Sequence, residues 1–227
     1  VWSEMKLGEG MVTEQIWPKY DESKCKDDVI EIVVQVNGKV RTRLSVAADI
    51  QKDDAIALAK AEDRIAAEMR KMFRTFSKLE VLKEDWPEYV RKAERLLFGD
   101  GQREYLERRK AFHKAIGLKS ASYDVWSCLL EQLMVYFVFT YFCGAVYDDH
   151  ILGKMQTAVV STILIQELAQ AVWQEKQEAF TFMDFVDVAH RYSREIEHSD
   201  INLLRLEKLF DRLPLFQPKQ LIRILSV

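Results

Sequence analysis

Four polar side chains near the end of the chain have the types and spacing of a binding face. His190, Arg194 and His198 recur every four residues, so a continuous helix would place all three on one face, with Glu197 beside it. A carboxylate suits an ammonium group, and such a face can bind a partner, a substrate lysine or a metal ion. The pattern therefore predicts a partner or substrate face formed by His190, Arg194, Glu197 and His198.

The same string also has a purely structural interpretation, which stays open. Ser199 or Asp200 can cap the helix that follows, while Arg194 and His198 interact with the last carbonyls of the helix before it. A metal site would need a third ligand at a fixed distance, which the spacing of two histidines does not supply. We therefore predict no metal here.

No complete catalytic motif accompanies this face, so the catalytic residues stay unassigned. Cys25, Cys128 and Cys143 lack the spacing of metal ligands, and their odd number favours a reducing cytoplasm over a disulfide framework. The isolated glycines form no turn that would cradle a nucleotide cofactor, and no serine lies in a nucleophile elbow. The residues alone therefore predict no cofactor and leave enzymatic activity undecided.

A second candidate face lies on a predicted β-hairpin at Glu31–Val46, which reads EIVVQVNGKVRTRLSV. A three-residue loop that ends at Gly38 would pair Val34 with Val40 and make one face apolar. The other face would then carry three basic residues, Lys39, Arg41 and Arg43, with Glu31 opposite Arg43. These cations can neutralise RNA phosphates, or they can simply keep an exposed strand soluble.

The hydrophobic pattern predicts a mainly α fold, in which a small β-hairpin plus helix module (residues 1–72) precedes a helical bundle domain (residues 73–227). An N-cap at Asp53 or Asp54 would start the module's helix. Turn signals separate the later helices, expected at Trp86–Phe98, Gln102–Ile116, Tyr123–Cys143, Asp148–Lys176, Thr181–Glu197 and Asp200–Leu213. Thr181 and Asp184 have the spacing of a capping box.

The most apolar stretch, Leu133–Tyr147, contains no charged residue. A membrane-spanning helix needs about 20 apolar residues, and acidic residues bracket this stretch too closely. Aromatic residues at all positions around a helix indicate burial from several directions. We therefore predict that this helix is the centre of the domain and that the chain has no membrane partner. The net charge of -3 also argues against a protein that coats nucleic acid over its whole surface.

The strings WPKYDE and IEIVVQVNGKVR resemble the C-terminal end of bacterial leucyl-tRNA synthetase over residues 1–65. In that family a W-P-x-Y-D connector leads into a small α/β domain that contacts tRNA. The resemblance implies tRNA as a partner, bound through Lys39, Arg41 and Arg43. The family's closing strand, rich in Val and Ile, has no counterpart after the helix here. Its nucleotide-binding signatures are also missing, so the chain cannot activate an amino acid.

A second resemblance covers residues 75–210, through WSCLLEQLMVYFVFTYFCGAVYDDHILGKMQTAVVSTILIQELA and YSREIEHSD. These strings resemble the C-terminal half of flagellin lysine-N-methylase, a bacterial family that methylates lysines on flagellin. The resemblance implies flagellin as a partner and S-adenosylmethionine as a possible methyl donor. The cysteine-rich N-terminal half of that family is missing here.

The second resemblance extends over more of the chain than the first, and we therefore give it priority. The leading prediction is the helical C-terminal portion of a flagellin lysine-N-methylase-like protein methyltransferase, which acts in substrate recognition or scaffolding and is inactive as this fragment. The alternatives are a tRNA-binding appendage of leucyl-tRNA synthetase and a non-catalytic helical interaction module. A first residue of valine rather than methionine predicts a fragment or a fusion.

Overall fold

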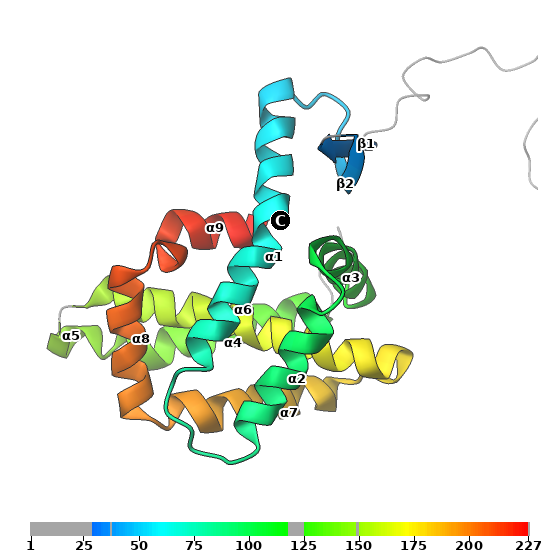
Figure 1. Ribbon diagram of the computed structural model, residues 1–227. Coiled ribbons are helices and arrows are strands. Elements are labelled where there is room, and N and C mark those ends of the chain that lie inside the picture. Colours follow the sequence, from blue (N-terminus) through cyan, green and yellow to red (C-terminus); the bar gives the residue numbers. More distant parts are fainter. Residues whose placement is uncertain (1–28, 37, 118–124, 149, 227) are drawn as a thin grey trace, which may run out of the picture.

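The computed structural model describes residues 29–36, 38–117, 125–148 and 150–226. These residues form a two-stranded antiparallel hairpin beside a cluster of helices, which confirms the predicted mainly α fold (Figure 1). The elements are β1 (Val29–Val36), β2 (Lys39–Ala47), α1 (Lys52–Phe76), α2 (Trp86–Phe98), α3 (Gln102–Ala115), α4 (Val125–Phe142), α5 (Ala145–Asp148), α6 (Ile151–Lys176), η3 (Gln177–Ala179), α7 (Phe182–Tyr192), η4 (Ser193–Glu197), α8 (Asp200–Arg212), η5 (Pro214–Phe216) and α9 (Pro218–Ser226).

The hairpin has a shorter turn than the sequence predicted. Val36 pairs with Lys39, so the paired strand ends are separated by two residues rather than three. Gly38 adopts a positive φ of 74°, as predicted for a tight turn at this position. The other intervening residue, Asn37, lies outside the described residues.

A β-bulge follows the turn and corrects the predicted pairing. Gln35 pairs with Val40, but the next residue of β1, Val34, pairs with Thr42, which leaves Arg41 as an extra residue in β2. The predicted pairing of Val34 with Val40 is therefore wrong, because it assumed a ladder without interruption. One inserted residue allows a two-residue turn and still keeps the apolar residues in phase further along the strands.

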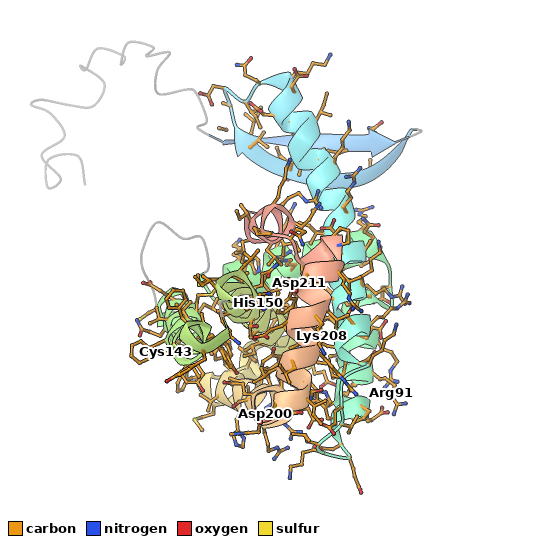
Figure 2. The ribbon with its side chains drawn as sticks, turned by 90° about the vertical axis from the view of Figure 1, so that its left-hand side faces the viewer. Arg91, Cys143, His150, Asp200, Lys208 and Asp211 are labelled. Carbon is orange, nitrogen blue, oxygen red and sulfur yellow. The ribbon has the colours of Figure 1, made fainter. Side chains whose placement is uncertain are left out.

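Beyond the bulge, the apolar residues of the two strands face each other. Ile32 pairs with Leu44 and Ile30 with Val46. Leu44 and Val46 are buried, and β2 packs on α1. The hairpin is thus held by burial of one face, as a two-stranded sheet needs such packing to be stable. In both views it lies beside the N-terminal half of α1, which extends away from the helical cluster (Figures 1 and 2).

Helix α1 joins the hairpin to the helical cluster. It begins two or three residues earlier than predicted, with Gln51 at the N-cap position. Asp53 and Asp54 lie in its first turn, where acidic side chains interact favourably with the helix dipole. Its second half is buried in the same core as the later helices, through residues Ile65, Met69, Met72 and Phe73. The boundary predicted after residue 72 therefore falls inside this helix, and the division into two domains stays a prediction.

Helix α6 is the centre of the cluster, and the prediction that α4 holds this position is wrong. α6 packs against α2, α3, α4, α7, α8 and α9. Its residues from 156 to 171 are almost all buried, and alanines at 158, 169 and 171 allow its neighbours to approach closely. A helix enclosed by six neighbours needs small side chains on several sides, which a helix crowded with aromatic rings does not offer.

Helix α4 packs on α6 with one face only. Phe137 is buried at 1% exposure, whereas Phe139 is 78% exposed. The exposed face of α4 also carries Val135, Tyr136 and Phe142. Uniform apolarity has no helical period, so the sequence could not distinguish the inner face from the outer one. Among the described residues, no helix is long and apolar enough to cross a membrane.

Candidate functional site between α4 and α7

The predicted polar face is interrupted by a wider helical turn. α7 ends at Tyr192, and η4 continues as a π-helix to Glu197, before His198. The backbone N–H of His198 donates to the carbonyl of Ser193 at 3.3 Å, five residues back, as a π turn requires. The predicted common face of His190, Arg194 and His198 assumed an uninterrupted α-helix, and its role in binding stays a prediction.

The π turn places Glu197 at a pocket between α4 and α7. The pocket has a volume of about 390 Å³, and its aromatic walls are Tyr136, Phe137, Phe182 and Phe185. Of the four residues predicted to form the binding face, His190 and Glu197 line this pocket. Arg194 and His198 do not. Single π turns within helices occur frequently at functional sites, which makes this pocket the candidate site.

Glu197 supplies the negative charge of the pocket. Tyr136 Oη and Tyr141 Oη both donate hydrogen bonds to Glu197 Oε2, at 3.1 and 3.0 Å. No other described residue forms a hydrogen bond or an ion pair with this carboxylate. Burial raises the pKa of the Tyr141 hydroxyl, and the nearby charge of Glu197 raises it further. The pKa of Tyr136 is raised by the same two causes. Both tyrosines therefore stay protonated as donors, and no cation of the described residues pairs with the Glu197 carboxylate.

The aromatic rings are held by stacking. Phe137 stacks on Tyr141 with ring centroids 6.1 Å apart and meets Tyr136 edge to face at 5.3 Å. Residues Tyr136 and Phe182 are 50% and 47% exposed, which leaves parts of their surfaces open to a ligand. Aromatic faces attract cations through their quadrupole, and here they lie in the same pocket as a carboxylate. The arrangement is suited to a cationic side chain.

A capping box fixes the start of α7, where Phe182 lies. Thr181 N and Thr181 Oγ1 both donate to Asp184 Oδ2, at 2.8 and 2.9 Å, and the reciprocal bond to the Asp184 backbone is also present. The capping box predicted from the sequence is thus confirmed. Lys176 forms an ion pair with Asp184, and the hydrogen bonds from Lys176 and from the Thr181 backbone lower the pKa of the Asp184 carboxyl.

A buried network fixes the π turn at its other side. The carboxylate of Glu195, 1% exposed, accepts hydrogen bonds from the backbone N–H groups of Leu82 and Lys83, at 2.6 and 3.0 Å. Asn202 Nδ2 donates to the Glu195 carbonyl at 3.2 Å. Ser199 caps α8 by accepting from Asn202 N at 3.2 Å, which confirms the predicted cap, whereas the predicted contacts of Arg194 and His198 with helix carbonyls stay a prediction. The loop before α2 and the start of α8 therefore support the turn that carries Glu197.

The predicted basic face of the hairpin is described only in part. Arg43 forms an exposed ion pair with Glu31 at 3.0 Å, and the two residues are diagonal neighbours because Arg43 pairs with Val33. Lys110 Nζ donates to the Arg43 carbonyl at 2.8 Å, which links α3 to β2. The side chains of Lys39 and Arg41 lie outside the described residues. Phosphate and tRNA contact by these three residues stays a prediction.

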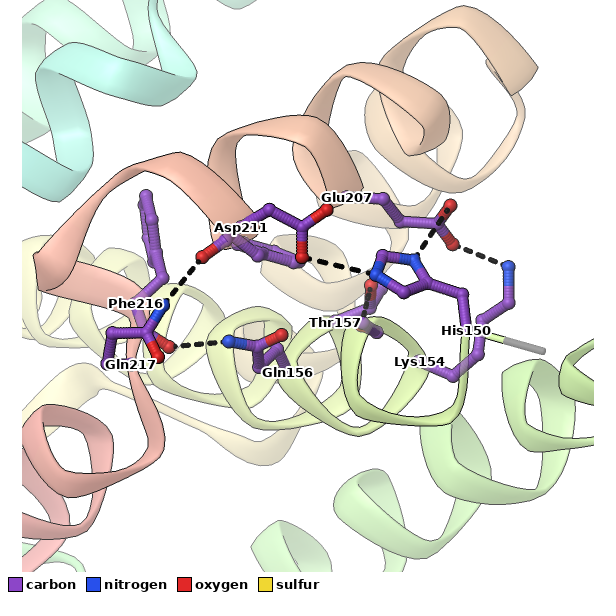
Figure 3. Close-up of polar contacts among 10 residues, drawn as sticks. His150, Lys154, Gln156, Thr157, Glu207, Asp211, Phe216 and Gln217 are labelled. Atoms are coloured by element: carbon purple, nitrogen blue, oxygen red, sulfur yellow. Dashed lines mark hydrogen bonds and ion pairs between the residues drawn. The ribbon is translucent and has the colours of Figure 1, made fainter. Parts of the chain in front are cut away.

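A second polar cluster connects the start of α6 to α8. Figure 2 shows His150 close to Asp211, and Figure 3 shows its ring between two carboxylates. His150 Nε2 lies 3.2 Å from Asp211 Oδ1, His150 Nδ1 lies 3.7 Å from Glu207 Oε2, and Lys154 also pairs with Glu207. The described residues contain no group of three or more His, Cys, Asp or Glu side chains placed to hold a metal. This cluster is explained by helix packing.

The sequence did not reveal the partners of Glu197. Tyr136 and Tyr141 are five residues apart on α4 and more than fifty residues from Glu197. One signal was available: the tyrosines interrupt an otherwise apolar stretch, and a buried tyrosine hydroxyl usually requires a hydrogen-bond partner. That signal indicates a polar partner near α4 but cannot identify it.

Comparison with known protein families agrees with the second resemblance. Residues 13–224 match the FliB lysine N-methylase C-terminal domain, so the match includes the hairpin, α1 and nearly all of the helical cluster. No solved structure matches the chain. The chain therefore belongs to the FliB lysine N-methylase C-terminal domain family.

Proposed function

We propose that the chain is the substrate-recognition portion of a flagellin lysine-N-methylase-like protein methyltransferase, and that the α4–α7 pocket receives a flagellin lysine. Membership of the FliB lysine N-methylase C-terminal domain family supports lysine as the substrate class. The observation that supports the position is the Glu197 carboxylate, which lines an aromatic pocket and forms no ion pair with a described residue. A carboxylate that lines an open pocket and pairs with no cation of the described residues favours a cationic ligand.

The pocket matches both parts of a lysine side chain. The aliphatic stem can pack on the apolar walls while the ammonium group reaches a polar atom. Glu197 would accept a charge-assisted hydrogen bond from that ammonium. The two tyrosine hydroxyls hold the carboxylate in place, so little side-chain freedom would be lost when the ligand binds.

Recognition, rather than methyl transfer, is the role proposed for this chain. S-adenosylmethionine carries a sulfonium and an ammonium group beside its carboxylate, so the charge of Glu197 does not separate the methyl donor from lysine, and we assign none of the pocket residues to the donor. We therefore derive no transfer step from these residues. The expectation is that the chain binds flagellin but does not methylate it alone.

Binding of purified flagellin to the chain, measured by isothermal titration calorimetry, tests the proposal. Glu197→Gln removes the charge but keeps the size, and loss of a hydrogen bond to a charged group should weaken binding at least about 10-fold. Glu84→Gln is the matched control, because Glu84 is exposed, precedes α2, does not line the pocket and gives the same change in net charge. Equal affinity of Glu197→Gln and the unsubstituted chain would refute the site.

Two further outcomes are informative. If Glu84→Gln weakens binding as much as Glu197→Gln does, the interaction depends on overall charge rather than on the pocket. Transfer of labelled methyl groups from S-adenosylmethionine to flagellin by this chain alone would refute the recognition-only role, since we expect none.

A further inference from the structure

We infer that the α4–α7 pocket binds Nε-methylated lysine more tightly than unmodified lysine, so that this domain holds the methylated product. The inference rests on the proposed function for the position of the ligand, and it adds a preference between methylation states. It follows from the composition of the pocket walls and from the single charge that they contain.

The walls offer few partners to a bare ammonium group. Nine of the thirteen residues that line the pocket are apolar or aromatic, and the polar ones are Gln132, His190, Ser193 and Glu197. An unmodified lysine has three N–H donors, each of which loses water on entering. Each added methyl group removes one of these donors and adds apolar surface, which the walls can bury.

The aromatic rings favour the methylated cation for a second reason. Tyr136 from α4 and Phe182 from α7 both line the pocket, and each is about half exposed. Aromatic faces attract weakly hydrated quaternary ammonium ions strongly, because little hydration is lost. The hydroxyl of Tyr136 is bonded to Glu197, which fixes the direction of its ring.

Glu197 attracts both ligands, because methylation of lysine keeps the positive charge. The carboxylate can accept a hydrogen bond only from an ammonium that keeps an N–H, so this contact favours unmodified lysine over the trimethyl form. The preference must therefore come from the rings and the apolar walls. We therefore expect that removing the charge of Glu197 weakens the binding of both ligands, whereas removing an exposed ring weakens mainly the binding of the methylated ligand.

The experiment measures the dissociation constants of N-acetyl-lysine amide and its Nε-trimethyl form by NMR titration of the chain. We expect the trimethyl form to bind about 10-fold more tightly. Phe182→Leu should reduce this ratio to about twofold, while the affinity for unmodified lysine changes little. Met183→Leu is the matched control, since Met183 is the adjacent residue, is 67% exposed and does not line the pocket.

The outcomes separate this inference from the proposed function. Equal or tighter binding of unmodified lysine, still weakened by Glu197→Gln, would refute the preference and leave the lysine site intact. Failure of both ligands to bind would refute both. A 10-fold preference that survives Phe182→Leu would show that the ring is not its cause and would also refute the inference as argued. Circular dichroism of each variant verifies that it is folded.

Discussion

Replacing Asn202 with leucine tests how the π turn is supported. The Asn202 side chain is fully buried and satisfies three of its hydrogen-bonding positions. Oδ1 accepts from Glu80 N at 2.7 Å, while Nδ2 donates to the carbonyls of Glu80 and Glu195, at 2.9 and 3.2 Å. One side chain therefore holds the loop before α2 and the π turn together.

The expected loss can be worked out from these three bonds. Leucine is close to asparagine in size, so the change creates little cavity, and the loss comes from the backbone groups of Glu80 and Glu195 that remain without partners. Each buried group left unsatisfied costs about 1–3 kcal/mol. Because Glu80 is only partly buried, water can reach some of these groups, and we expect a total loss of about 3–5 kcal/mol. For a chain of this size the melting temperature should fall by about 6–20 °C.

Urea unfolding followed by circular dichroism measures this loss, and Gln170→Met provides the comparison. Gln170 is also buried, at 1% exposure, but its Nε2 has no hydrogen-bond partner among the described residues. Its replacement should change the free energy of unfolding by less than about 1 kcal/mol. A loss below about 1 kcal/mol for Asn202→Leu, or an equal loss for both variants, would show that the hydrogen-bond argument is wrong.

Three further substitutions test the buried groups. Burial raises the pKa of Glu167, so ionisation of this carboxyl increasingly opposes folding as the pH rises above 4.5. The free energy of unfolding of Glu167→Gln should therefore increase relative to that of the unsubstituted chain between pH 4 and 7. A difference in urea unfolding that does not change with pH would contradict this. Burial raises the pKa of Tyr89 to about 12, and its hydroxyl lacks a partner among the described residues. Tyr89→Phe should leave stability at pH 7 unchanged or higher and abolish a loss of up to about 2.7 kcal/mol between pH 10 and 12, measured by urea unfolding at each pH. In Gly153→Ala the new Cβ would lie 2.6 Å from the His150 ring, and this contact should lower the stability measured by thermal unfolding by about 1 kcal/mol. If the contact is the cause, Gly153→Ala should cost much less in a chain that also carries His150→Ala.

The helices were predictable where the chain carries explicit stop and start signals. Trp86–Phe98 has the bounds expected from Pro87 and from the glycines that follow, and the Thr181–Asp184 capping box starts α7 as expected. Such signals act locally, through a few backbone groups, so they can be recognised in a single sequence. The same holds for Ser199 at the start of α8.

The features that the sequence did not reveal depend on contacts between distant segments. The hairpin combines a two-residue turn with the pairing of Ile32 and Leu44, and it can do so only because Arg41 is inserted as a bulge. Neither the turn nor the pairing predicts this bulge by itself. The inner face of α4 is decided by α6, whose small side chains lie more than fifteen residues further along the chain. In the candidate site, the sequence identified Glu197 and His190 but not Tyr136, because α4 and η4 are brought together only by packing.

The π turn explains why Glu197 has no cationic partner within the part of the chain that the structure describes. Arg194 precedes it by three residues, and in an uninterrupted α-helix an arginine and a glutamate at this spacing are neighbours that pair readily. In the wider turn they form no ion pair, and Arg194 Nε has no hydrogen-bond partner among the described residues. The altered helical geometry thus separates two charges that would otherwise neutralise each other. Glu197 is then stabilised by two tyrosine hydroxyls, which are neutral, so its charge stays available to a ligand.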